Sequence, residues 1–165
     1  MKKLIIIRGN SGSGKSSLSV ELRERALSPN RTALVEQDYL RRIVLKEKEA
    51  EGTNNIGLIS QTVRFALERD YDVILEGILF SERYSAMLSE LTKVADRNFI
   101  FYLDVSLEET LERHKKKHNA HEFGEKEMRG WYNKNDTLGF EGEIILPESN
   151  TMEDSINTIL QVTKI

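Results

Sequence analysis

The sequence predicts an α/β protein built on a parallel β-sheet. Short apolar runs alternate with longer segments of helical periodicity, which is typical of βα units that stack side by side. A glycine-rich segment follows the first apolar run directly and leads without interruption into a helical pattern. Five apolar runs are the expected strands, and they cover residues 4–7, 32–35, 73–75, 99–103 and 143–146.

Helical periodicity predicts a helix after most of these strands. In the first helix Leu18, Leu22 and Ala26 share one face, because residues three or four apart lie on the same side of a helix. Ser106 and Thr151 each stand three residues before an acidic residue, which is the spacing of a capping box. The expected helices are 15–27, 38–49, 59–68 and 81–94, followed by one from residue 106 and one from residue 151.

The composition limits the classes of protein to consider. The chain has 165 residues, 39% hydrophobic and 31% charged, as expected for one soluble domain. The first apolar run ends at Arg8, far short of the roughly 20 residues that cross a bilayer, so we expect neither a membrane span nor a signal peptide. The absence of cysteine excludes disulfides, thiolate metal sites and thiol nucleophiles, and it fits a cytoplasmic protein. A net charge of −3 argues against a protein that coats nucleic acid.

Residues 9–16 read Gly-Asn-Ser-Gly-Ser-Gly-Lys-Ser and match the phosphate-binding pattern G-x-x-x-x-G-K-S/T. Backbone N–H groups of such a loop, together with the N-terminus of the following helix, provide fixed donors for the charge of a triphosphate. A lysine at a helix N-terminus opposes the helix dipole, which favours a bound phosphate over a plain glycine-rich turn. The expected nucleotide contacts are Gly9, Asn10, Ser11, Gly12, Ser13, Gly14, Lys15, Ser16 and Ser17.

Two residues of this loop have individual expected roles. Lys15 would reach the β- and γ-phosphate oxygens and act catalytically there. The hydroxyl of Ser16 would hold a Mg²⁺ ion that bridges the same two phosphates. Ser16 is therefore the predicted metal ligand of the protein.

The chain resembles the small P-loop kinases, which include shikimate, gluconate and adenylate kinases, chloramphenicol phosphotransferase and the kinase domain of polynucleotide kinase. The resemblance rests on the phosphate-binding loop, on Asp38 after the second strand, on Leu75-Glu76-Gly77 after the third, on Asp104 and on residues 110–113. It implies the three-layer sandwich of P-loop NTPases, with a five-stranded parallel sheet of order 2-3-1-4-5, helices on both faces and a lid. It also implies ATP and Mg²⁺ as cofactors and a substrate site beyond the carboxyl ends of the strands.

Asp38 is the expected general base or hydroxyl-orienting residue, because it follows the second strand near the point where the γ-phosphate must lie. Its alternative role is an N-cap of the next helix, and Glu36 is a weaker candidate base. Arg41 or Arg42 would bind a carboxylate or phosphate of the substrate, unless both are merely solvated. Glu76 would bind a substrate hydroxyl or the water shell of Mg²⁺, with a plain strand-end carboxylate as the alternative.

Residues 113–140 are polar and lack a clean periodicity, so we expect a lid or substrate loop within a single domain of residues 1–165. Arg113 opens a basic run, and the resemblance implies that it acts catalytically by closing over ATP. Arg129 is expected to contact the substrate. Trp131 and Tyr132 have two equal interpretations, stacking on a ring of the acceptor or anchoring the lid.

Two other patterns in this segment are interpreted as coincidences. His114, His118 and His121 stand at helical spacing, but no acidic metal-site pattern accompanies them, and we expect them to face solvent. Residues 133–136 read N-K-N-D, as in the guanine-reading motif of many GTPases, but no apolar strand precedes them. We therefore expect ATP rather than GTP as the nucleotide.

Together these features predict an ATP-dependent kinase, a phosphotransferase that moves the γ-phosphoryl group onto a hydroxyl of a small molecule such as a sugar acid, nucleoside or antibiotic. A polynucleotide 5′-kinase or a nucleoside or nucleotide kinase is the alternative among enzymes. The acidic net charge disfavours nucleic acid as the acceptor. A regulatory switch that hydrolyses its nucleotide slowly is the alternative of another class, and Asp38 argues against it because a switch has no acceptor to orient.

Overall fold

The computed structural model describes residues 1–50, 52–116 and 124–165. Five parallel strands form one sheet in the order β2-β3-β1-β4-β5. This order confirms the predicted fold class, and each expected strand is present within a few residues of its predicted position. The strands are β1 (Lys3–Gly9), β2 (Thr32–Glu36), β3 (Asp72–Gly77), β4 (Arg97–Asp104) and β5 (Ile144–Pro147).

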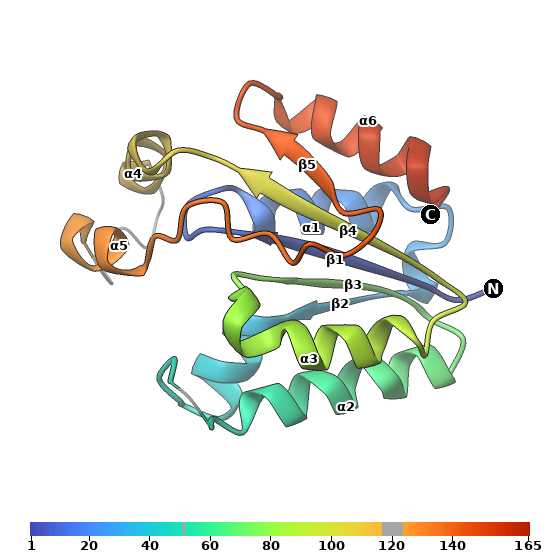
Figure 1. Ribbon diagram of the computed structural model, residues 1–165. Coiled ribbons are helices and arrows are strands. Elements are labelled where there is room, and N and C mark those ends of the chain that lie inside the picture. Colours follow the sequence, from blue (N-terminus) through green and yellow to red (C-terminus); the bar gives the residue numbers. More distant parts are fainter. Residues whose placement is uncertain (51, 117–123) are drawn as a thin grey trace.

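Figure 1 shows helices on both faces of the sheet, which confirms the three-layer sandwich. α1 and α6 pack together on one face, α2 and α3 cover the other, and the short α4 and α5 lie beyond the carboxyl ends of the strands. None of the described helices is long and apolar enough to cross a bilayer. The helices are α1 (Lys15–Arg25), α2 (Asn55–Glu68), α3 (Ser81–Thr92), α4 (Leu107–Lys115), α5 (Glu125–Trp131) and α6 (Met152–Thr163).

The central strand β1 divides the core into two clusters. Leu4 and Ile6 pack with side chains of α2 and α3, whereas Ile5 and Ile7 pack with side chains of α1 and α6. All four side chains are fully buried. A parallel strand that is covered on both faces is apolar at every position, which is why its sequence signal is a continuous apolar run.

Two helices begin with the caps that the sequence predicts. The Ser106 hydroxyl accepts a hydrogen bond from the Glu109 N–H at 3.2 Å at the start of α4. At the start of α6 the Thr151 hydroxyl accepts from the Asp154 N–H at 3.1 Å, and the Asp154 carboxylate accepts from the Thr151 N–H at 2.9 Å. Both bonds satisfy N–H groups that have no partner inside the helix.

The segment predicted as a helix over residues 38–49 is different in the structure. The helical structure ends at Val44, with Tyr39–Val44 as a π-helix, and at Lys46 the backbone takes a φ of 53°. The Glu47 carboxylate then accepts hydrogen bonds from the N–H groups of Asn54 and Asn55, at 3.1 and 3.0 Å, and so caps α2. The prediction is wrong beyond residue 44, because this cap holds the chain in a loop where the side-chain pattern alone favours a helix.

Residues 113–140 contain more regular structure than the sequence predicts. α5 lies within this segment, while residues 117–123 fall outside the described part of the chain. Met128 is the only buried residue among the seven of α5. A helix with one buried position leaves almost no periodic signal, which explains why the sequence indicates a loop there.

Candidate active site

The carboxyl ends of β1, β2 and β3 bring several predicted site residues to one edge of the sheet. In the parallel register Glu36 of β2 pairs with Glu76 of β3, and Ile7 of β1 pairs with Glu76 on its other side. The phosphate-binding loop begins two residues after Ile7, and Asp38 lies two residues beyond Glu36. The site forms at this edge because parallel strands all end on the same side of the sheet.

The phosphate-binding loop needs glycine at its tight positions. Gly12 has a φ of 81°, and a Cβ atom on it would lie 2.7 Å from the Thr110 carbonyl oxygen of α4. Gly14, with a φ of 102°, is the N-cap of α1. Glycine adopts these left-handed conformations without strain, so the loop can pack against α4 and still lead into the N-terminus of α1, where backbone N–H groups can bind phosphate.

Lys15, Ser16 and Glu76 form the centre of the site. The Lys15 ammonium donates a hydrogen bond to the Asn10 carbonyl oxygen at 2.9 Å, and the residue is 7% exposed. The Ser16 hydroxyl donates to the Glu76 carboxylate at 3.2 Å. Glu76 is 3% exposed, whereas Ser16 is exposed, so a buried cation and a buried carboxylate lie next to a hydroxyl that solvent can reach.

Burial raises the pKa of the Glu76 carboxyl, whereas the Lys15 charge and the Ser16 hydrogen bond lower it. The negative charges of Glu36 and Asp38 raise this pKa further. Hydroxyl and carboxylate oxygens are the ligands that Mg²⁺ prefers, so the residues present fit this ion. In the described parts of the chain no three His, Cys, Asp or Glu side chains form a metal-binding group, so nucleotide phosphates and water would have to complete the coordination.

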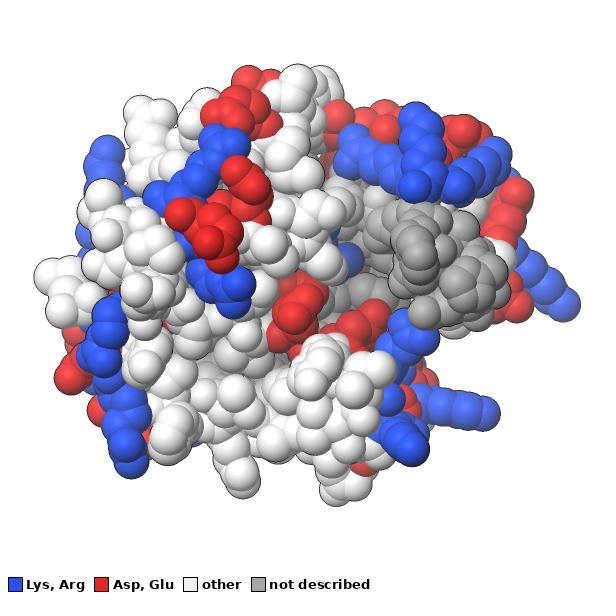
Figure 2. Space-filling model, turned by 180° about the vertical axis from the view of Figure 1, so that it is seen from behind, with Lys and Arg blue, Asp and Glu red and all other residues white. Residues whose placement is uncertain are grey.

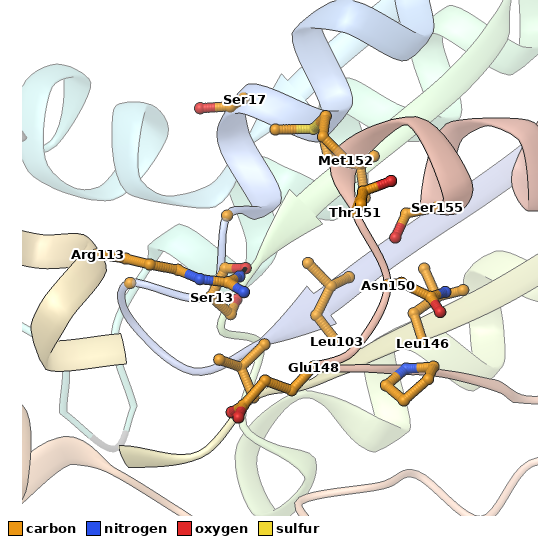
Figure 3. A pocket seen from close by; sticks show the side chains of 15 residues that line it. Ser13, Ser17, Leu103, Arg113, Leu146, Glu148, Asn150, Thr151, Met152 and Ser155 are labelled. Atoms are coloured by element: carbon orange, nitrogen blue, oxygen red, sulfur yellow. Dashed lines mark hydrogen bonds between the residues drawn. The ribbon is translucent and has the colours of Figure 1, made fainter. Parts of the chain in front are cut away.

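A cavity of about 390 Å³ opens beside the loop (Figure 3). Arg113 reaches from α4 towards it, where its Nη1 donates to the Ser13 carbonyl oxygen at 3.0 Å and its Nε pairs with Glu109 at 2.7 Å. Of the nine predicted nucleotide contacts, Gly12, Ser13, Gly14 and Ser17 line this cavity. Other lining residues come from β4, β5 and the start of α6, among them Leu103, Leu146, Thr151, Met152 and Ser155.

A second cavity, of about 560 Å³, also borders the loop, through Ser11. The phosphate-binding loop therefore lies between two cavities, with Ser11 on one and residues 12–14 on the other. The second cavity is lined by charged side chains of the segment after β2 and by apolar side chains from the β3–α3 connection and α5. They include Asp38, Arg41, Arg42, Ile78, Phe80 and Trp131.

The Asp38 side chain is 57% exposed and lies at the second cavity. Arg41 Nη2 donates a hydrogen bond to one of its carboxylate oxygens at 2.7 Å, and Arg42 Nη1 lies 3.9 Å from the other. Asp38 precedes the π-helix, but its side chain forms no capping hydrogen bond. The geometry therefore favours a role in the cavity over the alternative role of a cap.

The two arginines predicted for substrate binding differ in their surroundings. Arg41 is held between Asp38 and Glu49, with its Nε 3.2 Å from the Glu49 carboxylate, and its side chain is only 13% exposed. Glu49 in turn accepts hydrogen bonds from Arg83 and Tyr84, each at 3.1 Å. Arg42 is 40% exposed at the same cavity, so it is the more accessible of the pair.

Arg129 is not brought to either cavity. Its side chain is 51% exposed and pairs with Glu125 on the same helix at 2.6 Å. The expectation that three histidines face solvent is wrong for His114, which is 5% exposed, because it lies on the inward face of α4 with Thr110 and Leu111. His118 and His121 lie outside the described residues.

Arg8 is a buried residue of the site that the sequence indicated only as the end of an apolar run. It is fully buried in β1, immediately before the loop, and its guanidinium donates to the Leu79 carbonyl oxygen at 2.8 and 3.1 Å. It also donates to the Asp136 carbonyl oxygen at 2.8 Å and pairs with the Asp136 carboxylate at 2.9 Å. The sequence signal that could have identified Arg8 is its position, because a charged residue stands there between a buried strand and the phosphate-binding loop. Nothing in the sequence indicated that Asp136 is its partner.

The Asp136 carboxylate is turned into the protein. It accepts hydrogen bonds from Arg8 and from the Ser81 N–H at the start of α3, and the residue is 8% exposed. An aspartate that reads guanine must face the base, so this environment favours the interpretation of residues 133–136 as a structural segment.

The side chain of Asn10, one of the predicted nucleotide contacts, binds another segment of the protein. Its Nδ2 donates to the Asn133 carbonyl oxygen and its Oδ1 accepts from the Asn133 N–H, both at 2.9 Å. The Tyr102 hydroxyl lies beside this pair and accepts from Asn10 at 3.4 Å and from the Asp136 N–H at 3.3 Å. Burial raises the pKa of Tyr102 to about 12, so the hydroxyl stays protonated. The Asn10 side chain thus connects the loop to residues 133–136.

Figure 2 shows one face of the molecule with Lys and Arg side chains interspersed among Asp and Glu. A protein that follows a nucleic-acid backbone is expected to show a continuous basic stripe. On this face the basic residues do not gather into such a stripe.

The fold and the loop define a P-loop protein with the architecture of small kinases. The chain belongs to the AAA domain family AAA_33, whose model matches residues 4–131. A comparison with curated proteins gave no match.

Solved structures of small-molecule kinases have the same fold. An APS kinase from Mycobacterium tuberculosis in complex with AMPPNP and APS matches with a TM-score of 0.74 and 16% identity, over 99% of this chain and 98% of that one. A gluconokinase from Sinorhizobium meliloti 1021 matches with a TM-score of 0.69 and 14% identity, over 98% of this chain and 94% of that one. A shikimate kinase from Acinetobacter baumannii in complex with shikimate matches with a TM-score of 0.60 and 21% identity, over 98% of this chain and 92% of that one. The predicted resemblance to small P-loop kinases is confirmed at the level of the fold.

Proposed function

We propose that this protein is an ATP-dependent kinase that transfers the γ-phosphoryl group of ATP to a hydroxyl of a small molecule. The phosphate-binding loop lies between two cavities, and this single arrangement supports the proposal most strongly. One cavity suits a nucleotide and the other, which contains Asp38, suits an acceptor. The kinases among the similar structures support the same reaction class.

ATP would occupy the smaller cavity with its phosphates on the loop. The apolar side chains of Leu103 and Leu146 suit the base and ribose, and the N–H groups before α1 suit the phosphates. Arg113 hydrogen-bonds to Ser13 in the loop, so its guanidinium is beside the expected position of the phosphates. Mg²⁺ would be held by Ser16 and, through water, by Glu76, and would neutralise charge on the β- and γ-phosphate oxygens.

The transfer step needs an acceptor oxygen in line with the γ-phosphorus. In this step the acceptor oxygen forms a bond to the γ-phosphorus, the bond from that phosphorus to the β,γ-bridging oxygen breaks, and ADP leaves. The Asp38 carboxylate accepts the hydroxyl proton, and Arg41 holds the carboxylate in position. Lys15 and Arg113 stabilise the charge on the phosphoryl oxygens and the leaving group.

Two alternatives receive less support. A polynucleotide 5′-kinase would need a basic track for the backbone, whereas the face in Figure 2 has charges of both signs close together. A nucleotide switch with slow hydrolysis does not account for the larger cavity, whose lining includes three carboxylate residues, two arginines and two lysines.

The test is ATP consumption against a panel of hydroxyl compounds, with each phosphorylated product identified by mass spectrometry. We expect at least one acceptor to gain a phosphoryl group in proportion to the ADP released. The Lys15→Ala variant, which lacks the ammonium at the loop, should show no transfer, whereas Lys93→Ala on the far end of α3 should behave like the wild type. ADP release that never depends on an added acceptor would overturn the kinase proposal.

A further inference from the structure

We infer that the acceptor carries a flat aromatic or heteroaromatic ring in addition to its reactive hydroxyl, and that Trp131 and Phe80 bind this ring. The inference rests on the proposed kinase function and names the substrate class of the same site. It selects nucleosides and aryl-substituted alcohols over ring-free sugar acids and polyols.

The acceptor cavity combines two chemically different sets of side chains. The charged set, with Asp38, Arg41 and Arg42, comes from the segment after β2. The apolar set consists of Ile78 and Phe80 from the β3–α3 connection and Trp131 from the end of α5. A ring-free polyol would place its hydroxyls against the apolar set without hydrogen bonds, whereas a ring would cover it.

The β3–α3 connection is held in an unusual conformation that presents Ile78 and Phe80 to the cavity. Leu79 has a φ of 46°, a left-handed conformation that is costly for a branched side chain, and it is fully buried in the core. Its carbonyl oxygen accepts from Arg8, and its N–H donates to the Gln37 side chain at 3.0 Å. These bonds hold the turn so that Leu79 enters the core and Ile78 lines the cavity, while Phe80 packs against the core and also lines the cavity.

Residues on both sides of Trp131 fix the end of α5. Met128 is 2% exposed and packs where α5 meets the loop, and the Tyr132 hydroxyl donates to the Val105 carbonyl oxygen at 3.0 Å. Trp131 itself is 45% exposed at the cavity. The Tyr132 hydrogen bond agrees with the anchoring interpretation, and the place of Trp131 in the cavity lining agrees with the stacking interpretation.

The size of the cavity agrees with such a ligand. About 560 Å³ lies within the range of roughly 300–1,000 Å³ found for sites that bind drug-sized molecules. A ring and an attached hydroxyl-bearing group would fill the space between the apolar set and Asp38.

Trp131 is the single tryptophan of the chain, so its fluorescence reports directly on this cavity. The experiment is a titration of the whole protein with Mg²⁺ and the non-hydrolysable analogue AMPPNP present throughout. The ligands are matched pairs that differ by a ring, namely uridine against ribose, adenosine against ribose, and phenyl β-glucoside against methyl β-glucoside, with gluconate as an acid that lacks an aromatic ring. We expect at least one ring-bearing compound to change the fluorescence and to bind about tenfold more tightly than its partner, which corresponds to about 1.4 kcal/mol.

Variants test the same inference through transfer. With the ring-bearing compound that serves as acceptor, Trp131→Ala should lower kcat/KM about tenfold and Trp131→Phe should retain most of it, because phenylalanine still offers a ring face. The matched control is Phe65→Ala, which removes an exposed aromatic side chain on α2 remote from the cavity and should leave kcat/KM unchanged.

The possible outcomes separate this inference from the kinase proposal. Binding of a ring-bearing compound, together with no transfer from ATP to any compound of the hydroxyl panel, would support the ring site and overturn the kinase function. Transfer to a ring-free acceptor with equal or better kcat/KM, or no response of Trp131 to any ring-bearing compound, would overturn the inference and leave the kinase function standing.

Discussion

Arg8 and Asp136 form a buried ion pair across 128 residues of sequence, with the guanidinium nitrogen and the carboxylate oxygen 2.9 Å apart. Arg8 is fully buried and the Asp136 side chain is 6% exposed. Burial lowers the pKa of Arg8, and the charge of Asp136 is the strongest opposing influence. The pair joins the strand before the phosphate-binding loop to the segment after α5, and through Leu79 and Ser81 it also reaches the wall of the acceptor cavity.

Asp136→Ala should destabilise the protein strongly, because it leaves the Arg8 charge buried without its main partner. Removal of one member of a buried pair typically costs about 3–5 kcal/mol, which urea unfolding followed by circular dichroism can measure. The matched control is Glu90→Ala, which breaks the exposed pair with Lys93 and should leave the urea midpoint almost unchanged. Equal midpoints for the two variants would contradict the structural role of Asp136.

Asp38→Asn should separate acceptor chemistry from nucleotide binding. The amide keeps the size of the side chain but removes the proton acceptor, so transfer should fall about 10²- to 10⁴-fold. The affinity for ATP should change little, because the nucleotide cavity is lined by other residues. The measurements are product formation and calorimetric titration with ATP. Full activity of the variant would transfer the role of base to Glu36 or Glu76.

Glu76→Gln should weaken the response to Mg²⁺ while the fold remains intact. Glutamine still accepts the hydrogen bond of Ser16, but it lacks the charge that would orient the water shell of the ion. We expect the Mg²⁺ concentration for half-maximal transfer to rise about 10- to 100-fold, as for the loss of an outer partner in other metal sites. An unchanged Mg²⁺ titration would leave Glu76 as a plain strand-end carboxylate.

The pKa of Glu76 gives this variant a second signature. Burial raises the pKa of the folded carboxyl above its ordinary value, so the folded protein keeps the proton to a higher pH than the unfolded chain. Stability from this group is therefore present at low pH and is lost as the pH rises through the raised pKa. Without nucleotide, the melting temperature of Glu76→Gln should exceed that of the wild type by a margin that grows from about pH 5 to about pH 8. A margin that shrinks over this interval would contradict the direction of the shift.

ATP with Mg²⁺ should raise the melting temperature more than GTP at the same concentration. Ligand that binds only the folded state stabilises it by RT ln(1 + [L]/Kd), so a difference in affinity appears directly as a difference in the shift. The carboxylate of Asp136 is engaged by Arg8 and Ser81, which leaves residues 133–136 poorly suited to read guanine. A larger shift with GTP would show that another part of the nucleotide cavity selects the base.

Local sequence patterns were sufficient for the sheet and for the phosphate-binding loop. Residues 4–7 are apolar at every position because β1 is covered on both faces, and this pattern is visible without knowledge of any partner. The loop is recognisable because Gly12 and Gly14 must take left-handed conformations and Lys15 follows at a helix start. Asp38 was placed at a strand end by the same local signal.

The loss of the helix over residues 38–49 shows where local patterns fail. The apolar and charged residues of this segment have helical spacing, but Glu47 caps α2 and Glu49 binds Arg41, Arg83 and Tyr84. Hydrogen bonds to other segments therefore outweigh a helix propensity that amounts to a few tenths of a kcal/mol per residue. The same segment supplies the charged wall of the acceptor cavity.

By itself the sequence determined the parallel α/β fold, the loop that binds phosphate and the acidic residues at the strand ends, because each follows from residues close together in the chain. The tertiary structure alone decided that Arg8 pairs with Asp136, that Asn10 binds Asn133 and that Trp131 lies at the cavity with Phe80. These pairs join segments that only the assembled fold brings together, and no periodicity in the sequence records which distant residue will satisfy a buried charge or amide.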